Sequence, residues 1–203
     1  INEINQLHHQ DVRSDYDRYF YTNAVTQQYR VNIRGGSNTN AYTLGINYDR
    51  NRGSLYALFN KLNIHILNTY RPVKNLQLTI GAYYTNSTSA SGRPSSVTFD
   101  GKNVPYIQLM DNDGNPSAIA QNYSTSYTDT AGGGKLLDWK YYPLEDYKHN
   151  KLETSIEEIN ANICLNYKII NGLDVDILYQ YERQTSNAVR KADIESFYTR
   201  NLI

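Results

Sequence analysis

The stretch Leu173-Asp174-Val175-Asp176-Ile177-Leu178-Tyr179-Gln180-Tyr181-Glu182 decides the fold, because large apolar residues occupy every second position along it. Successive side chains of a β-strand point to opposite faces of the sheet, so this spacing predicts a strand with one apolar and one mostly polar face. An amphipathic helix would place apolar residues at i, i+3, i+4 and i+7, and the stretch lacks that pattern.

Five further segments alternate in the same way, and the six predicted strands lie near residues 27–34, 40–50, 58–70, 76–85, 156–167 and 173–184. A tilted transmembrane β-strand needs roughly 9–11 residues, which is close to the length of these segments. No stretch approaches the roughly 18 apolar residues of a transmembrane helix. We therefore predict an all-β chain that forms an antiparallel, up-and-down segment of a transmembrane β-barrel.

The connections between these segments fall into two length classes. Those after the first, third and fifth strands are short and comprise residues 35–39, 71–75 and 168–172. Those after the second and fourth strands are longer and comprise residues 49–54 and 86–155. Outer-membrane barrels have short periplasmic turns at one end and long extracellular loops at the other. Residues 86–155 are therefore predicted to form a long extracellular loop.

Composition supports a sheet that is exposed to two different environments. Only 39% of the 203 residues are hydrophobic, below the usual roughly 45–50%. Tyr accounts for 20 residues, against four Phe and one Trp, and Tyr suits both strands and membrane interfaces. Several predicted strands end in Tyr, as in an aromatic girdle: Tyr48, Tyr70, Tyr84, Tyr167, Tyr179 and Tyr181. The net charge of zero offers no basic face for nucleic acid.

Several motifs, in this order along the chain, resemble the SusC/RagA family of TonB-linked outer-membrane proteins. They are the acidic-aromatic stretch 15–20, the strand 27–37 that closes with Gly-Gly-Ser, the segments 41–48, 60–64 and 74–81, the aromatic-Pro loop 137–144, and residues 195–203. The resemblance implies a roughly 22-stranded barrel closed by a plug. Residues 1–203 would supply about six of its strands, and the plug, the other strands and a signal peptide would lie outside this sequence.

The same resemblance implies the function and the partners. A TonB complex would supply energy through the absent plug region, and a SusD-like surface lipoprotein would deliver glycans or peptides to the barrel in the bacterial outer membrane. Two alternatives stay open: a passive porin without a plug, and a soluble surface β-module that binds glycans or acts as an adhesin.

The long loop is the most favoured functional element, because long ordered loops are often binding elements. Tyr106, Trp139, Tyr141 and Tyr142 are the candidates for contact with a substrate or with the lipoprotein lid, while the alternative is that they only hold the loop together. We expect no enzyme and no cofactor, since no Ser/His/Asp grouping or phosphate-binding Gly loop is present. Counted from Asp111, the sixth and twelfth positions, where a calcium loop needs Gly and Glu, hold Pro116 and Asn122, so residues 111–116 predict a turn. The adjacent pair His8-His9 has no ligand spacing, and no metal site is expected.

Overall fold

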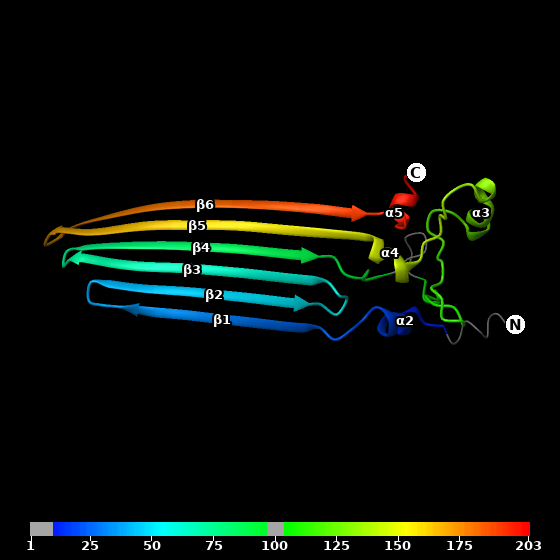
Figure 1. The fold of residues 1–203 in the computed structure, drawn as a ribbon, viewed down its shortest axis with the longest axis horizontal. Helices are drawn as coiled ribbons and strands as arrows, with labels where there is room; N and C mark the ends of the chain where they lie inside the picture. The colour runs from blue at the N-terminus through cyan, green and yellow to red at the C-terminus, as the bar shows by residue number, and fades with distance from the viewer. Residues whose placement is uncertain (1–9, 97–103) are drawn as a thin grey trace.

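The structure is a computed structural model that describes residues 10–96 and 104–203, and these residues form a six-stranded antiparallel sheet. Each strand pairs with the next one along the chain, in the order β1-β2-β3-β4-β5-β6, and the sheet is not closed (Figure 1). Strands account for 54% of the chain and helices for 15%. The predicted all-β class and up-and-down strand order are confirmed.

The strands are longer than predicted, mostly toward one end of the sheet. They are β1 (Val25–Gly36), β2 (Asn40–Arg52), β3 (Leu58–Val73), β4 (Leu76–Ala90), β5 (Asn150–Ile170) and β6 (Leu173–Ala192). The long connection is therefore residues 91–149 and not 86–155. The prediction stopped short because polar residues occupy both faces beyond the alternating segments, for example Ser87, Thr88 and Ser89. The period-2 signal is lost there, although the backbone pairing continues.

The two length classes of connection lie at opposite ends of the sheet, as predicted. The turns at residues 37–39, 74–75 and 171–172 lie at one end, which we call the turn end (Figure 1). Gly172 has a φ of 90°, which a residue with a Cβ rarely adopts. The connections 53–57 and 91–149 lie at the opposite end.

Five short helical segments also lie beyond this second end: α2 (Val12–Tyr19), α3 (Thr125–Thr130), η1 (Ala131–Gly134), α4 (Pro143–His149) and α5 (Phe197–Arg200). We call the described residues 10–24, 53–57, 91–149 and 193–203 together the cap. None of the helices in the described part of the chain is long and apolar enough to cross a membrane.

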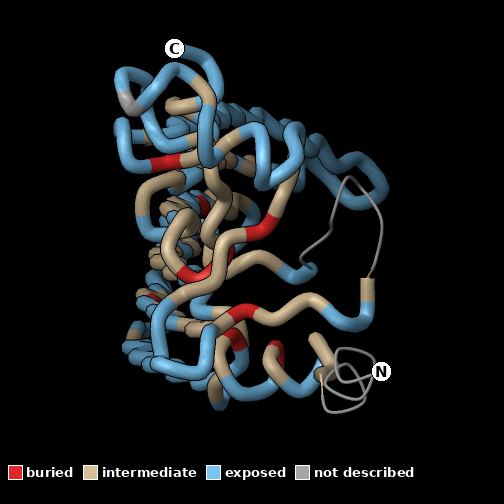
Figure 2. Tube along the Cα trace, turned by 90° about the vertical axis from the view of Figure 1, so that its right-hand side faces the viewer, coloured by how far each residue is buried: buried red, intermediate tan, exposed pale blue. Residues whose placement is uncertain are grey.

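The buried core lies in the cap and not on the sheet. The buried hydrophobic residues of the described segments are Tyr16, Phe20, Leu109, Ile119 and Leu144, and all five belong to the cap. Figure 2 looks at the molecule from this end and shows buried positions among the loops. The sheet itself has no layer packed on either face in the described residues, so its side chains are left without a core of their own.

The strand register assigns each residue to one sheet face, since directly paired residues of antiparallel strands point the same way. Tyr29 pairs with Tyr48, which pairs with Leu62, so the three share one face. Arg30 pairs with Asn47 on the opposite face. We call the first the belt face and the second the polar face.

Candidate functional site

The belt face carries a continuous band of apolar and Tyr side chains, which we call the apolar belt. Its members are Tyr29, Val31 and Ile33 of β1; Tyr42, Leu44, Ile46 and Tyr48 of β2; Leu62, Ile64 and Ile66 of β3; Leu76, Leu78, Ile80, Ala82 and Tyr84 of β4; Ile159, Ala161, Ile163, Leu165 and Tyr167 of β5; and Val175, Ile177, Tyr179 and Tyr181 of β6. Many are well exposed, with Ile177 at 55% and Tyr179 at 63%. Soluble monomers rarely expose contiguous apolar patches above a few hundred Å². The belt would therefore be stabilised by an apolar environment.

The height of the belt is comparable to that of the apolar band of outer-membrane barrels. On β4 it runs from Leu76 to Tyr84, which is about 27 Å at about 3.4 Å per residue. A strand tilt of about 35–45° would reduce this to a height of about 20 Å. The apolar band of outer-membrane barrels is about 25 Å tall.

The belt also runs obliquely across the strands. Cross-strand pairs connect Tyr29 of β1 to Thr185 of β6, but the belt ends on β6 at Tyr181, four residues nearer the turn end. Four residues are about 13 Å, and five strand spacings are about 24 Å, which gives an angle of about 30°. This is near the tilt of strands in a barrel. Figure 1 shows the same stagger, since the three turns step outward from β1–β2 to β5–β6.

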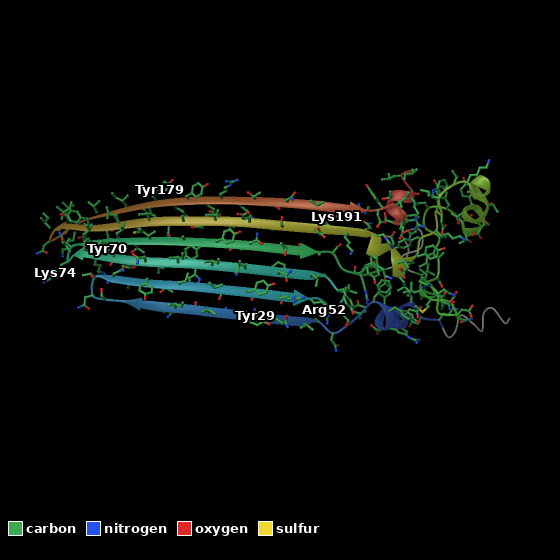
Figure 3. All side chains as sticks on the ribbon, viewed as in Figure 1. Tyr29, Arg52, Tyr70, Lys74, Tyr179 and Lys191 are labelled. Atoms are coloured by element: carbon green, nitrogen blue, oxygen red, sulfur yellow. The ribbon has the colours of Figure 1, made fainter. Side chains whose placement is uncertain are left out.

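Tyr side chains mark both limits of the belt. Tyr29, Tyr48, Tyr84 and Tyr181 lie at its cap side, and Tyr42, Tyr70 and Tyr167 lie at its turn side. Figure 3 shows Tyr29 toward the cap end of the sheet and Tyr70 toward the turn end. Beyond the cap-side Tyr residues the belt face becomes polar and charged, because Arg50 follows Tyr48 on β2 and Arg183 follows Tyr181 on β6.

The polar face is crowded by side chains that lie over glycines. A Cβ on Gly45 would collide with the His65 ring, and one on Gly81 would collide with the Asn162 amide oxygen. His65 also stacks on Tyr83, with ring centroids 6.3 Å apart. The Asn162 amide oxygen is buried without a hydrogen-bond partner in the described part of the chain. A polar face of this kind suits contact with water or with another polar protein segment.

Helix α2 and the Phe20 that caps its C-terminal end supply two of the five buried cap residues, Tyr16 and Phe20. Asp11 caps the helix by accepting a hydrogen bond from the Arg13 amide at 2.9 Å. Tyr16 and Phe20 stack with ring centroids 4.7 Å apart and belong to the same cluster as Leu109. The sequence signal for this helix is the capping Asp11 followed by apolar residues at helical spacing.

Arg93 is the residue that ties α2 to the rest of the cap. Its Nη1 donates hydrogen bonds to the carbonyl oxygens of Tyr19 and Phe20, at 2.9 and 2.8 Å. Its guanidinium lies 4.0 Å from the centre of the Tyr56 ring. A cation at the C-terminal end of a helix is stabilising, because it compensates the helix dipole. Nothing in the sequence pattern links Arg93 to a helix more than seventy positions away, so its role could not be predicted from the sequence.

Of the four candidate contact residues, two hold the cap together. The Trp139 indole Nε1 donates to the Arg200 carbonyl at 3.1 Å, and its ring stacks on Tyr123 at 5.5 Å. Tyr141 packs edge-on against Phe197 at 5.4 Å. Both residues connect the long connection to α5. This favours the alternative that these aromatic residues hold the loop together.

Tyr142 and Tyr106 occupy different surroundings. The Tyr142 hydroxyl donates to the Asp138 carboxylate at 3.3 Å, and Tyr142 lines a cavity described below. Tyr106 is 51% exposed. The structure therefore does not bring the four candidates together in one site.

Burial raises the pKa values of three tyrosines in the cap. Burial and the nearby charge of Asp146 raise the pKa of Tyr141 to about 12. Burial is also the main reason why the pKa values of Tyr16 and Tyr142 are raised. These phenols stay protonated at neutral pH, so they act as hydrogen-bond donors and apolar surfaces there.

A cavity of about 590 Å³ lies between α4 and the segment that leads into α5. Its polar lining comprises Tyr142, Glu145, Asp146, His149, Glu195 and Arg200. The two His149 ring nitrogens lie 3.0 Å from the Asp193 carboxylate and 3.2 Å from that of Glu195. The hydrogen bond from His149 is the main cause of a lowered pKa for Asp193. This lining offers acceptors and donors to a polyhydroxyl ligand.

The structure forms a turn at residues 111–116, as predicted. The Asp111 carboxylate accepts hydrogen bonds from the amides of Asp113 and Asn115, at 3.0 and 2.7 Å, and these bonds lower its pKa. Gly114 has a φ of 86°. Within the described residues no three His, Cys, Asp or Glu side chains form a group that could hold a metal ion. His8-His9 lies outside the described residues.

No protein-family model matches this chain, and no curated protein matches it.

Proposed function

We propose that this chain is part of the wall of an outer-membrane β-barrel, in which the apolar belt faces lipid and the polar face lines the interior. The observation that carries this proposal is the belt: a band of exposed apolar residues, limited on both sides by Tyr and oblique to the strands. A lipid bilayer supplies the apolar environment that such a band requires.

The open edges of the sheet support a larger barrel. β1 and β6 each pair with only one strand in the described part of the chain, and every residue of β6 but its last is exposed. Long edge strands with unpaired backbone groups favour pairing with further strands. In the hydrocarbon core of a membrane every backbone N–H and C=O must be hydrogen-bonded within the protein, so an open sheet edge does not occur there. In this proposal, strands from outside residues 1–203 pair with both edges and close the barrel.

Within that class, we propose a TonB-dependent importer of the SusC/RagA type, located in the bacterial outer membrane, which takes up glycans or peptides delivered by a SusD-like lipoprotein. The ordered motifs of the sequence support this choice. So does a cap that has its own buried core and an acceptor-rich cavity on the side of the long connections. Carbohydrate hydroxyls would find both hydrogen-bond donors and acceptors in that lining.

Two measurements separate this proposal from a porin and from a soluble β-module. The gene that encodes this chain should encode a plug domain upstream, and uptake of labelled oligosaccharide by cells that express it should stop when TonB is removed. Uptake that continues without TonB, in a protein without a plug, would indicate a porin. A purified chain that stays a monodisperse monomer without detergent would indicate a soluble module.

A further inference from the structure

A small groove on the belt face lies just beyond the cap-side Tyr residues of β1 and β2. It has a volume of about 230 Å³ and is lined by Val25, Gln27, Arg50, Arg52 and Leu58. We call it the arginine groove. Figure 3 shows Arg52 at the cap end of the sheet, beyond Tyr29.

Strand geometry places Arg50 and Arg52 on the same face of the sheet. Residues i and i+2 of a strand share a face and lie about 7 Å apart, so Arg50 and Arg52 both project from the belt face. Arg50 pairs with Gln27 on β1, and Arg52 pairs with Leu58 on β3. Asn51, between the two arginines, and the acidic Asp49, which precedes them, both lie on the opposite face.

The groove carries positive charge that has no ion-pair partner in the described part of the chain, although the Arg52 guanidinium lies 5.4 Å from the centre of the Tyr56 ring. Among the ion pairs of the described residues, none involves Arg50 or Arg52. The Arg52 Nε is buried and has no hydrogen-bond partner in the described part of the chain. Leaving a buried donor unpaired is unfavourable, so an acceptor that hydrogen-bonds to the Arg52 guanidinium would be favoured.

We propose that the arginine groove binds the phosphate of a membrane-lipid headgroup, with the acyl chains of that lipid lying against the apolar belt below it. This inference rests on the proposed membrane location. Tyr girdles lie at the level of the headgroups, and guanidinium groups bind phosphate oxygens through paired, charge-assisted hydrogen bonds. The groove therefore lies at the depth where a lipid phosphate is present, next to apolar surface for its chains.

The test uses the full chain in detergent, with phosphatidic acid as the probe and diacylglycerol with the same chains as the lipid that lacks phosphate. Retained lipid is measured by native mass spectrometry for wild type, for the double variant Arg50→Gln/Arg52→Gln, and for the control Arg30→Gln/Arg34→Gln. The control also removes two positive charges, but from the polar face of the sheet, on β1. We expect wild type and control to prefer phosphatidic acid over diacylglycerol, and Arg50→Gln/Arg52→Gln to bind phosphatidic acid at least about tenfold more weakly.

A second variant covers the case in which the first one fails to fold. Arg50→Lys/Arg52→Lys keeps both charges but loses the paired hydrogen bonds, and we expect its affinity for phosphatidic acid to fall severalfold. Equal losses in the groove variants and in the control would overturn the proposal, because they would indicate attraction by net charge alone. Displacement of phosphatidic acid by inorganic phosphate at an equal concentration would also overturn it, because the groove would then bind free anions.

Failure of this inference is distinguishable from failure of the proposed function. If the wild-type chain does not associate with lipid vesicles, both are wrong. If it inserts into vesicles but the groove variants bind phosphatidic acid as tightly as wild type, only the lipid-phosphate site is wrong.

Discussion

Tyr29 and Tyr48 lie directly opposite each other on β1 and β2, with ring centroids 6.4 Å apart and ring planes 24° apart. The pair lies at the limit of the apolar belt, since apolar residues follow on the turn side and Arg50 on the cap side. A phenol ring has an apolar body and a polar tip, which suits a boundary between lipid and water. The pair thus marks the level at which the environment of the sheet is proposed to change.

Charge in the middle of the belt should impair folding into a bilayer. Ile163 lies halfway along the belt on β5, and we expect Ile163→Arg to lose about 2–4 kcal/mol of folding free energy in lipid vesicles. The control Asn160→Arg introduces the same side chain on the polar face, opposite Glu182, and should change stability by no more than about 0.5 kcal/mol. Equal effects of the two substitutions in a urea titration would mean that the faces are assigned wrongly.

The close approach of His65 to Gly45 predicts a specific coupling. A Cβ at position 45 would meet the His65 ring, so Gly45→Ala should destabilise the chain by about 1–3 kcal/mol. In a His65→Ala background the same substitution should cost at least about 1 kcal/mol less, because the obstructing ring is gone. A double-mutant cycle measured by denaturant unfolding checks this, and additive effects would contradict the contact.

Removal of the Arg93 side chain should release α2 and leave the sheet intact. Arg93→Gln loses the two hydrogen bonds to Tyr19 and Phe20, so hydrogen exchange in α2 should accelerate about tenfold or more while β3 and β4 keep their protection. The matched control is Arg13→Gln, whose side chain is 86% exposed and pairs only with Asp11. If the control accelerates exchange as much as Arg93→Gln, Arg93 does not fasten the helix.

Alkaline pH should loosen the cap before the sheet. The pKa of Tyr141 is raised from 10.0 to about 12 in the folded cap, so the unfolded cap loses this proton at a lower pH than the folded cap. Above about pH 10 the unfolded form therefore binds fewer protons, and cap stability should fall as the pH rises toward 12.

Trp139 is the only Trp of the chain, and its fluorescence reports this transition in the cap. Tyr141→Phe removes the titrating phenol and should weaken the pH dependence, although the raised pKa of Tyr16 leaves part of it. Tyr106→Phe changes an exposed ring and should leave the pH dependence as in wild type. A profile that is identical in Tyr141→Phe and wild type would show that Tyr141 is not the group responsible.

Alternation was sufficient to predict the strands and their order, because one face of each central segment is apolar. Ile159 to Tyr167 on β5 shows this clearly, with apolar residues at every second position. The outer parts of β5 and β6 were missed, because a strand that is polar on both faces has no periodic signal. Glu153 and Lys191 illustrate this: they pair at 2.7 Å on the belt face, well beyond the belt.

The cap was largely beyond prediction from the sequence, because its core joins distant segments. Phe20 and Leu109 are both fully buried, but Phe20 precedes β1 and Leu109 lies between β4 and β5, and no local pattern links them. The aromatic residues of the long connection were identified, but the role of Trp139 depends on a carbonyl of Arg200 in another segment. Such contacts follow from tertiary packing, which spacing along the chain does not reveal.

The proposal that the belt faces lipid is tested most directly by the accessibility of β5 in a bilayer. Single cysteines at each position from 157 to 167, in a Cys164→Ser background, would carry nitroxide labels, and their collisions with oxygen and with a water-soluble nickel complex would be measured. We predict that labels at 159, 161, 163, 165 and 167 collide mainly with oxygen, that labels at 160, 162, 164 and 166 collide more with nickel, and that position 157 is water-exposed. Equal nickel accessibility at neighbouring positions along the whole strand would contradict the membrane location.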